Sequence, residues 1–350
     1  MKNILLNCKE IDKWNSYLKK IPSVSRNIYA SPGYISLYEN ASDKGYCYIC
    51  INKEKIFLYP FILRDIPGDK KYKDITTPYG YGGPLTNTNN KDFIKNSFKN
   101  LRLEQIKLNV VAELIKFNPF IENKKIIESY DGKLIHDRDI VYVDNKEFKK
   151  DDVNISYSKS SKKKTNKFGN GLIEIKIIKS NKELIFNYGV SEKYLIEFEK
   201  IYNSSLDNLK AHKSYYKKKS FYKKLFKFLT KNYIILNLYE KKKLINSQLL
   251  IFDELSCHCH MMGSDENAKK NNFVVYAYHK VIKWVNSKGF KILNLGGGRT
   301  SNPNDSLLNF KKNFSKRTKK YLIGEKVINK KIYDILCKGA TDNKFLFKYR

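Results

Sequence analysis

A glycine run followed by a lysine is the first stretch of this sequence whose residue types could do chemistry. Residues 293–315, LNLGGGRTSNPNDSLLNFKKNFS, begin as an apolar strand, break into three glycines and pass through a polar turn. Glycines at a strand end let backbone N–H groups approach a ligand carbonyl or phosphate closely. Asp305 predicts the start of a short helix that carries Lys311, a compact cation. The competing interpretations are that the glycines only end a strand and that Lys311 faces solvent.

A Cys-His-Cys-His run at residues 257–260 offers two further kinds of chemistry. On a strand, Cys257 and Cys259 would face one side and the two histidines the other, so at most two ligands would converge on a metal. We therefore predict no metal site here. His260 is a candidate proton acceptor, because imidazole titrates near neutral pH, and a core histidine is the alternative.

Two tyrosine-containing stretches are candidate binding segments. TPYGYGGPL, residues 77–85, is a turn-rich loop in which prolines restrain the backbone around flexible glycines and present Tyr79 and Tyr81. A purely structural loop is the alternative. IYNSSLDNLKAHKSYY, residues 201–216, follows an amphipathic helical pattern and contains Tyr202 and Tyr215.

Apolar periodicity predicts the elements that must position these residues. In the second half we expect strands at 171–178, 233–240, 244–252, 255–262, 290–295 and 321–328. Helices are expected over 194–209, from residue 220, over 274–285 and over 305–313. In the first half we expect a hairpin of 46–51 with 55–63, a strand region at 105–117, and helices near 14–21, 34–38 and 93–101.

The length of 350 residues favours two domains. Residues 144–170 are dominated by Lys, Asp, Ser and Asn and interrupt the hydrophobic pattern, so the boundary is expected near them. The prediction is a first domain of residues 1–150 and a second of residues 151–350. Within this polar stretch, lysines 159, 162, 163, 164 and 167 form either a solvated connector or a phosphate or tRNA contact.

The element order of the second half, β-α-α-β-β-β-α-β-α-β, is that of the GNAT acyltransferase fold. The sequence resembles the FemAB-like branch of that fold, which includes the peptidoglycan-bridge aminoacyltransferases and the BioF2-like acetyltransferase domains. The resemblance rests on DITTPYGYGGPL (74–85), LIKFNPFIEN (114–123), HMMGSDENAKKNN (260–272) and the two stretches 201–216 and 293–315, and it covers nearly the whole chain. It implies an α/β protein of two tandem GNAT-like domains with mixed sheets flanked by helices.

The resemblance also implies a reaction, the transfer of an acyl or aminoacyl group to an amine on a sugar, an amino acid or a cell-wall precursor. In the family, a Phe-Lys pair matching Phe310 and Lys311 is associated with stabilising the charge that develops at the transferred carbonyl. A tyrosine-containing pattern matching residues 202–215 lines the acceptor site. Asn208 stands where that pattern has an arginine, which argues against the usual cell-wall nucleotide precursor.

The donor is either acyl-CoA or aminoacyl-tRNA. The segment GSDENAKKNN, residues 263–272, has one glycine and two acidic residues where most GNAT enzymes hold the CoA pyrophosphate on a glycine-rich turn. This argues against CoA binding at that point and leaves both donors open. In the same family comparison, Lys116 and Asn118 replace an arginine and a histidine.

The net charge of +33 suggests a polyanionic partner, such as tRNA or the anionic face of a membrane. Only seven of the 68 basic residues are arginine, however, and Lys, Asn, Ile and Tyr are abundant together, as an AT-rich genome would produce. The start of the chain has no signal-peptide-like apolar run, and no stretch approaches the length of a membrane span. We expect a cytoplasmic protein, at most located at the inner face of the membrane, with reduced cysteines.

The sequence therefore predicts an acyltransferase that moves an acyl group, such as acetyl, to an amine of a cell-surface sugar or peptidoglycan-related precursor. The acceptor would be a small or lipid-linked amine, and no stable protein partner is expected. The alternatives are an aminoacyl-tRNA-dependent enzyme of the peptidoglycan-bridge type and a non-catalytic nucleic-acid-binding protein. The candidate residues are Lys311 and His260 for catalysis, and Tyr79, Tyr81, Tyr202, Tyr215, Gly296, Gly297, Gly298, Asp305 and Phe310 for substrate binding.

Overall fold

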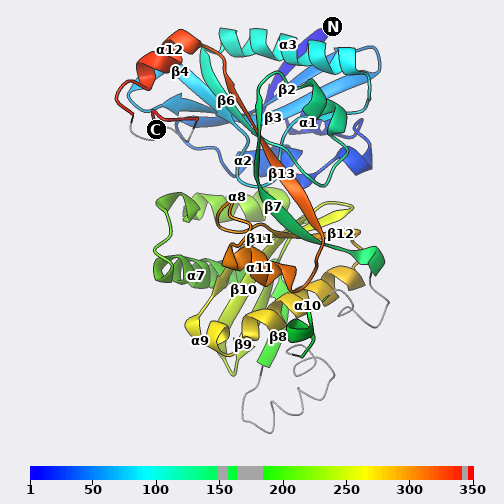
Figure 1. Ribbon diagram of the computed structural model, residues 1–350, viewed down its shortest axis with the longest axis vertical. Helices are drawn as coiled ribbons and strands as arrows, with labels where there is room; N and C mark the ends of the chain where they lie inside the picture. The colour runs from blue at the N-terminus through cyan, green and yellow to red at the C-terminus, as the bar shows by residue number, and fades with distance from the viewer. Residues whose placement is uncertain (148–156, 164–183, 341–345) are drawn as a thin grey trace. The chain divides into compact units, whose positions relative to one another are not determined.

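The computed structural model describes residues 1–147, 157–163, 184–340 and 346–350 (Figure 1). In it, the chain folds into two units. The first unit comprises Met1–Asp137 and Lys320–Arg350, and the second comprises Arg138–Lys319. This division differs from the predicted ranges 1–150 and 151–350, because the last part of the chain returns to the first unit. No helix among the described residues is both long enough and apolar enough to cross a bilayer.

The first unit is built on a sheet whose strands lie in the order β1-β2-β3-β4-β6-β13. Only β4 and β6 run parallel to each other, and the short β5 pairs with β3. The predicted hairpin is confirmed, because β2 and β3 pair in register from Asp43↔Arg64 to Asn52↔Lys55 around Lys53, which has a positive φ of 55°. β13 pairs with β6 from Ile323↔Lys116 to Val327↔Ala112, and this pairing returns the chain end to the first unit. The strands are β1 (Lys2–Asn7), β2 (Asp43–Asn52), β3 (Lys55–Ile66), β4 (Asp69–Thr76), β5 (Leu85–Thr86), β6 (Val110–Lys116) and β13 (Thr318–Val327).

Helices cover this sheet, and the longest, α3 (Lys91–Lys107), begins at Asn90, whose side chain accepts a hydrogen bond from the N–H of Phe93. Its apolar stripe is buried as predicted. The predicted strand region at 105–117 is partly wrong, because residues 105–107 still belong to α3 and the strand begins at Val110. The other helices are α1 (Ile11–Leu18), α2 (Pro32–Ser36), α4 (Lys124–Ser129) and α12 (Lys330–Leu336), with 3-10 turns η1 (Ser23–Ser25) and η2 (Ile28–Ala30).

The second unit has a sheet in the order β7-β12-β11-β10-β9-β8, in which only β11 and β12 run parallel. The strands predicted at 233–240, 244–252 and 255–262 are confirmed as β9, β10 and β11, which pair antiparallel in that order. The edge strand β8 was not predicted, and the strand expected at 171–178 lies outside the described residues. The strands are β7 (Lys133–Asp144), β8 (Leu184–Gly189), β9 (Tyr233–Glu240), β10 (Lys243–Phe252), β11 (Ser256–Ser264) and β12 (Ile292–Gly296), and the 3-10 turn η3 (Asn145–Glu147) follows β7.

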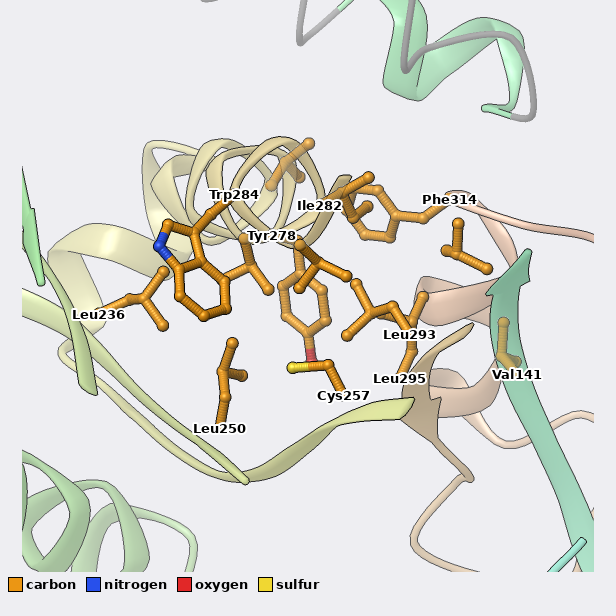
Figure 2. Close-up of a cluster of buried hydrophobic side chains, with 14 of the residues drawn as sticks. Val141, Leu236, Leu250, Cys257, Tyr278, Ile282, Trp284, Leu293, Leu295 and Phe314 are labelled. Carbon is orange, nitrogen blue, oxygen red and sulfur yellow. The ribbon is translucent and has the colours of Figure 1, made fainter. Parts of the chain in front are cut away.

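Helix α10 (Phe273–Ser287) covers one face of this sheet, and its apolar side forms the core of the unit. Figure 2 shows side chains from α10 pointing toward the strands, with Tyr278 beside Cys257, and with Leu293, Leu295 and Phe314 completing the cluster. Burying such side chains contributes roughly 1.5–3 kcal/mol each. The connecting residue Tyr157 also reaches this core, and its hydroxyl lies 3.2 Å from His279 Nδ1. Of the five connector lysines, positions 164 and 167 lie outside the described residues.

Helix α7 (Glu192–Asn208) packs against β10 and β11. A Cβ at Gly263 would lie 2.6 Å from the backbone nitrogen of Tyr202, so glycine is needed there for the helix to approach the strand. The remaining elements of this unit are α8 (Lys219–Leu229), α9 (Glu266–Lys270), α11 (Ser306–Lys312) and the 3-10 turn η4 (Lys213–Tyr215).

Candidate active site

The site begins where the parallel strands β11 and β12 stop pairing. Their register includes three pairs, Ser256↔Ile292, Cys257↔Leu293 and His258↔Asn294. Beyond Asn294 the register of β12 against β7 shifts, so that Gly296 lies opposite Val141. The pairing of β11 with β10 also shifts, which leaves His260 as an extra residue between Cys259 and Met261. Bulges of this kind redirect side chains and are common beside active sites.

Lys311 is a buried cation near the end of the β11–β12 pairing. Its side chain is only 8% exposed, and Nζ donates a hydrogen bond of 2.8 Å to the carbonyl oxygen of Gly297. Burial lowers the pKa of Lys311 to about 8, with Cys259 and Asp305 acting in the opposite direction and Arg138 adding to the decrease. No carboxylate of the described residues forms an ion pair with it. The alternative of a solvent-facing lysine is therefore wrong, because the ammonium lies inside the fold and a backbone carbonyl is its partner.

The glycine run is arranged with its carbonyl groups toward cations. The carbonyl of Gly297 accepts from Lys311, and the carbonyl of Gly298 accepts from Arg138 Nη1 at 2.8 Å. The N–H of Gly296 donates to Asn294 Oδ1 at 2.7 Å, so this group is already used within the fold. The prediction that the glycines present their N–H groups to a ligand is therefore not met at this position.

Close packing is a second reason why glycine occupies these positions. A Cβ at Gly297 would lie 2.8 Å from Arg138 Cδ, and a Cβ at Gly298 would lie 2.6 Å from Asp305 Cγ. Gly296 has a φ of 83°, in the region that favours glycine. The run thus allows β7 and the start of α11 to approach β12, which fixes the carbonyl that holds Lys311.

Asp305 is the predicted N-cap of α11, and both of its carboxylate oxygens are occupied. Oδ1 accepts from the N–H groups of Leu307 and Leu308 at 2.9 and 3.0 Å. Oδ2 accepts from the N–H groups of Arg299 and Thr300 at 3.1 Å. Burial would raise the pKa of Asp305, but these hydrogen bonds outweigh it and lower the pKa to about 2. The carboxylate joins the glycine loop to α11, so it positions Lys311, and it raises the pKa of that lysine without forming an ion pair with it.

The histidines of β11 belong to a different environment. His258 Nδ1 lies 3.1 Å from Asn294 Nδ2 on the neighbouring strand. Burial lowers the pKa of both His258 and His260 to about 3, and Lys217 adds to the decrease at His260. A general base works best with a pKa near the working pH, so this environment makes His260 a weak proton acceptor.

Tyr202 and Tyr215 come together at the α7–α8 connection. The Tyr202 hydroxyl donates to the Tyr215 carbonyl at 3.2 Å, and its ring stacks on Phe198 with centroids 5.4 Å apart. Tyr215 itself is 46% exposed. Nearby, burial lowers the pKa of Lys217 to about 8, and its Nζ donates to the Ser214 carbonyl at 3.4 Å.

Phe310 is part of the aromatic packing around α11. Its ring lies 5.4 Å from that of Tyr278 and 5.5 Å from that of Phe314. These rings fix the helix from which Lys311 projects. Phe310 therefore helps to orient Lys311 through its packing on the neighbouring rings.

Tyr79 and Tyr81 lie in the first unit, whereas the other candidate residues lie in the second. Tyr34 donates its hydroxyl hydrogen to the Tyr79 carbonyl, and Tyr321 donates to the Gly80 carbonyl at 2.8 Å. The Tyr81 ring packs 5.2 Å from that of Tyr321, while Tyr79 is 44% exposed. The loop is thus held by tyrosine hydroxyls, and Tyr79 is the more accessible of the two candidates.

Sequence reasoning missed Arg138, Asn294 and Lys217. Arg138 could have been found, because arginine is rare in this lysine-rich chain and a planar fork with several donors suits a pair of neighbouring carbonyls. Asn294 carried a weaker signal as a polar residue inside an apolar strand. No local pattern marked Lys217 among its lysine neighbours.

The comparisons with known proteins agree on the fold. No protein-family model matches the sequence, and no curated protein matches it. The crystal structure of FemX matches 96% of this chain and 99% of its own with a TM-score of 0.69 at 10% sequence identity. The chain has the FemX fold.

Two further solved structures support the description as a FemX-like fold. A tandem GNAT protein from the clavulanic acid biosynthesis pathway matches 93% of this chain and 98% of its own, with a TM-score of 0.54 at 7% identity. The C-terminal domain of a putative lysylphosphatidylglycerol synthetase from Agrobacterium fabrum covers 89% of this chain and 92% of its own, with a TM-score of 0.54 at 9% identity. The predicted fold class, an α/β protein of tandem GNAT-like domains with mixed sheets, is confirmed.

Proposed function

We propose that the protein is an acyltransferase of the GNAT type, which moves an acyl group to an amine of a cell-surface sugar or peptidoglycan-related precursor. The observation that carries the proposal is the buried ammonium of Lys311, whose partner is a single carbonyl at the end of the β11–β12 pairing. The FemX-like fold supports the same class of reaction.

The proposed role of Lys311 follows from the charge changes in acyl transfer. A neutral amine attacks the carbonyl carbon of the donor, and the carbonyl π electrons move onto oxygen to form an oxyanion. When the carbonyl re-forms, the bond to the leaving sulfur or oxygen breaks, and that leaving group takes the proton lost by the amine. A positive charge that is already in place stabilises the oxyanion without reorganisation, an effect worth about 10²–10³ in rate for one donor.

The protonation state of Lys311 suits this role. With a pKa of about 8, the side chain is mostly protonated at neutral pH, yet it holds its proton less tightly than an exposed lysine. A negative charge at its Nζ would offset the cost of burial. Lys311 is therefore expected to interact more strongly with the oxyanion than with the neutral carbonyl, as transition-state stabilisation requires.

The donor is an activated carbonyl, either the thioester of acyl-CoA or the ester of an aminoacyl-tRNA. The segment before α10 folds into the short helix α9, capped by Asp265, in place of a glycine-rich turn. This feature favours a donor that does not depend on a pyrophosphate site at the start of α10.

Mass spectrometry of surface glycans and wall peptides, from cells with and without the gene, tests the proposal. Loss of an acetyl or longer acyl mass would identify the donor as acyl-CoA, and loss of an amino-acid mass would identify aminoacyl-tRNA. The purified protein should then transfer the same group to the isolated acceptor. Identical masses in both cell types, together with no transfer by the purified protein, would contradict the proposal.

A further inference from the structure

The connection between α7 and α8, together with α8 itself, forms the most one-sided charged segment of the chain. Residues 209–231 contain nine lysines and neither an acidic residue nor an arginine. Seven of these lysines are exposed, and the other two, at positions 217 and 224, are partly buried. Acidic residues make up 35 of 350 positions, so about two would be expected in a stretch of 23. The segment therefore differs from the general lysine excess of the protein.

Helix α8 separates this charge from its apolar residues. Phe221, Tyr222, Leu225 and Leu229 are buried against the unit. The opposite side of the helix carries exposed residues one turn apart, Lys219, Lys223, Phe226, Lys227 and Thr230. Because residues three and four apart share a helix face, the lysines project together in one direction. We call this side, together with Lys218, the α8 face.

Apolar side chains also project from this segment. Phe226 is 43% exposed in the middle of the α8 face, and Leu209 and Tyr215 on the preceding connection are 44% and 46% exposed. A segment that exposes both large apolar side chains and lysines combines two attractions, one toward negative charge and one toward a non-aqueous phase. A lysine surface that only faces water would not need exposed apolar side chains.

We propose that the α8 face binds the surface of an anionic lipid bilayer. Lysines near such a surface contribute roughly a fivefold gain in affinity each, and the exposed apolar residues would enter the boundary between headgroups and acyl chains. Lipid is favoured over RNA because phosphate and base recognition in nucleic acids favours the planar arginine fork, which this segment lacks.

The inference is independent of the proposed chemistry, because binding to lipid requires no turnover. If the acyltransferase proposal also holds, the α8 face would bring a lipid-linked acceptor to the unit that holds Lys311. That consequence rests on both proposals. The binding itself rests on the α8 face alone.

Sedimentation of the full-length protein with vesicles tests the inference. The protein should bind vesicles of phosphatidylglycerol and phosphatidylcholine far more tightly than vesicles of phosphatidylcholine alone, and added salt should weaken binding. A variant with Lys218→Gln, Lys219→Gln, Lys223→Gln and Lys227→Gln should bind on the order of 100-fold more weakly or worse. The matched control removes four exposed lysines of the first unit, Lys9→Gln, Lys19→Gln, Lys95→Gln and Lys99→Gln, and should change binding by only a few-fold.

A second variant separates lipid from other polyanions. Phe226→Gln should reduce the part of vesicle binding that survives high salt, while leaving binding to heparin or RNA unchanged. The variants' circular dichroism spectra must match that of the parent chain. Equal loss of binding in the two four-lysine variants would overturn the inference. So would RNA binding that depends on the α8 face without any preference for anionic vesicles.

Discussion

Arg102 in the first unit and Lys311 in the second are both buried cations, but their surroundings differ. Arg102 donates to Glu113 at 2.7 Å, to Gln105 at 2.6 Å and to Asp131 at 2.7 Å. Burial by itself would lower the pKa of Arg102, but the two carboxylates outweigh it and raise the pKa above its ordinary value. Lys311 has one carbonyl partner, and burial lowers its pKa to about 8.

The comparison distinguishes a structural charge from one that can act on a ligand. The positive charge of Arg102 is neutralised by carboxylates within the fold, so an added anion would not be stabilised there. Around Lys311, the Asp305 carboxylate is held by backbone N–H groups and forms no ion pair with Nζ, so it offsets only part of the cost of burying the positive charge. Buried charges without a partner are costly, which makes them candidates for function.

The largest expected effect is on stability in the first unit. Arg102→Met should lower the free energy of unfolding by about 3–5 kcal/mol, because it leaves the fully buried Glu113 carboxylate without its ion-pair partner. Lys107→Met on the same helix is the control, because Lys107 forms an exposed pair with Glu104 and should cost less than about 1 kcal/mol. Urea unfolding measures both. Equal effects would remove the distinction between the two cations.

The second effect concerns pH and Lys311. Its pKa is about 8 in the folded chain and about 10.5 when unfolded, so the unfolded chain holds more protons between these values. Stability should therefore rise with pH through this window, by about 2–3 kcal/mol between pH 7 and 10. Other groups titrate there too, so the quantity to measure is the difference between the parent chain and Lys311→Met at each pH. A difference that stays constant with pH would show that the pKa of Lys311 is not lowered.

A smaller change in stability is expected at Asp305, whose side chain both caps α11 and carries a negative charge close enough to affect Lys311. Asp305→Ala removes the N-cap of α11 and should cost about 1 kcal/mol. Asp305→Asn keeps an acceptor for Leu307 and Leu308, but its NH2 group would face the N–H groups of Arg299 and Thr300, so this variant should also lose stability. Both variants should lower the pKa of Lys311 further, because the carboxylate raises it. Thermal unfolding and NMR titration of the lysine side chain would measure these two outcomes. An unchanged Lys311 pKa in both variants would contradict the assignment.

The smallest expected effect is the stability change for Lys311→Met at pH 7. Removing an uncompensated buried charge stabilises the fold, while leaving the Gly297 carbonyl without its donor destabilises it. The two terms should offset to within about 1 kcal/mol. A loss as large as that of Arg102→Met would mean that Lys311 is a structural cation of the same kind.

Local patterns predicted the elements around the site well. The three strands predicted between 233 and 262, the helix predicted over 274–285, the strand predicted at 290–295 and the Asp305 cap all depend on residues close in sequence. Features that depend on distant pairing were not predicted. Arg138 reaches the Gly298 carbonyl because β7 pairs with β12, and β13 returns the chain end to the first unit by pairing with β6. The apolar periodicity of a single strand does not indicate which distant strand it will pair with, so neither pairing could be predicted from it.

The histidines show where a local rule is incomplete. Strand alternation predicted that His258 and His260 share a face, but the register shift makes His260 an extra residue in β11. The low pKa of about 3 follows from burial, which a single strand's sequence cannot reveal. Residue type alone therefore suggested His260 as a proton acceptor, whereas its buried surroundings disfavour that role.

The rate of acyl transfer by Lys311→Met, with Lys312→Met as the adjacent partly exposed control, measures whether the Lys311 ammonium stabilises the oxyanion. Both variants are compared with the parent chain on the donor and acceptor that mass spectrometry identifies, after circular dichroism shows that they are folded. Lys311→Met should lose about 100- to 1,000-fold in rate, because the oxyanion loses its cation, and Lys312→Met should change little. A folded Lys311→Met protein that keeps its rate within a few-fold of the parent would contradict this role of Lys311.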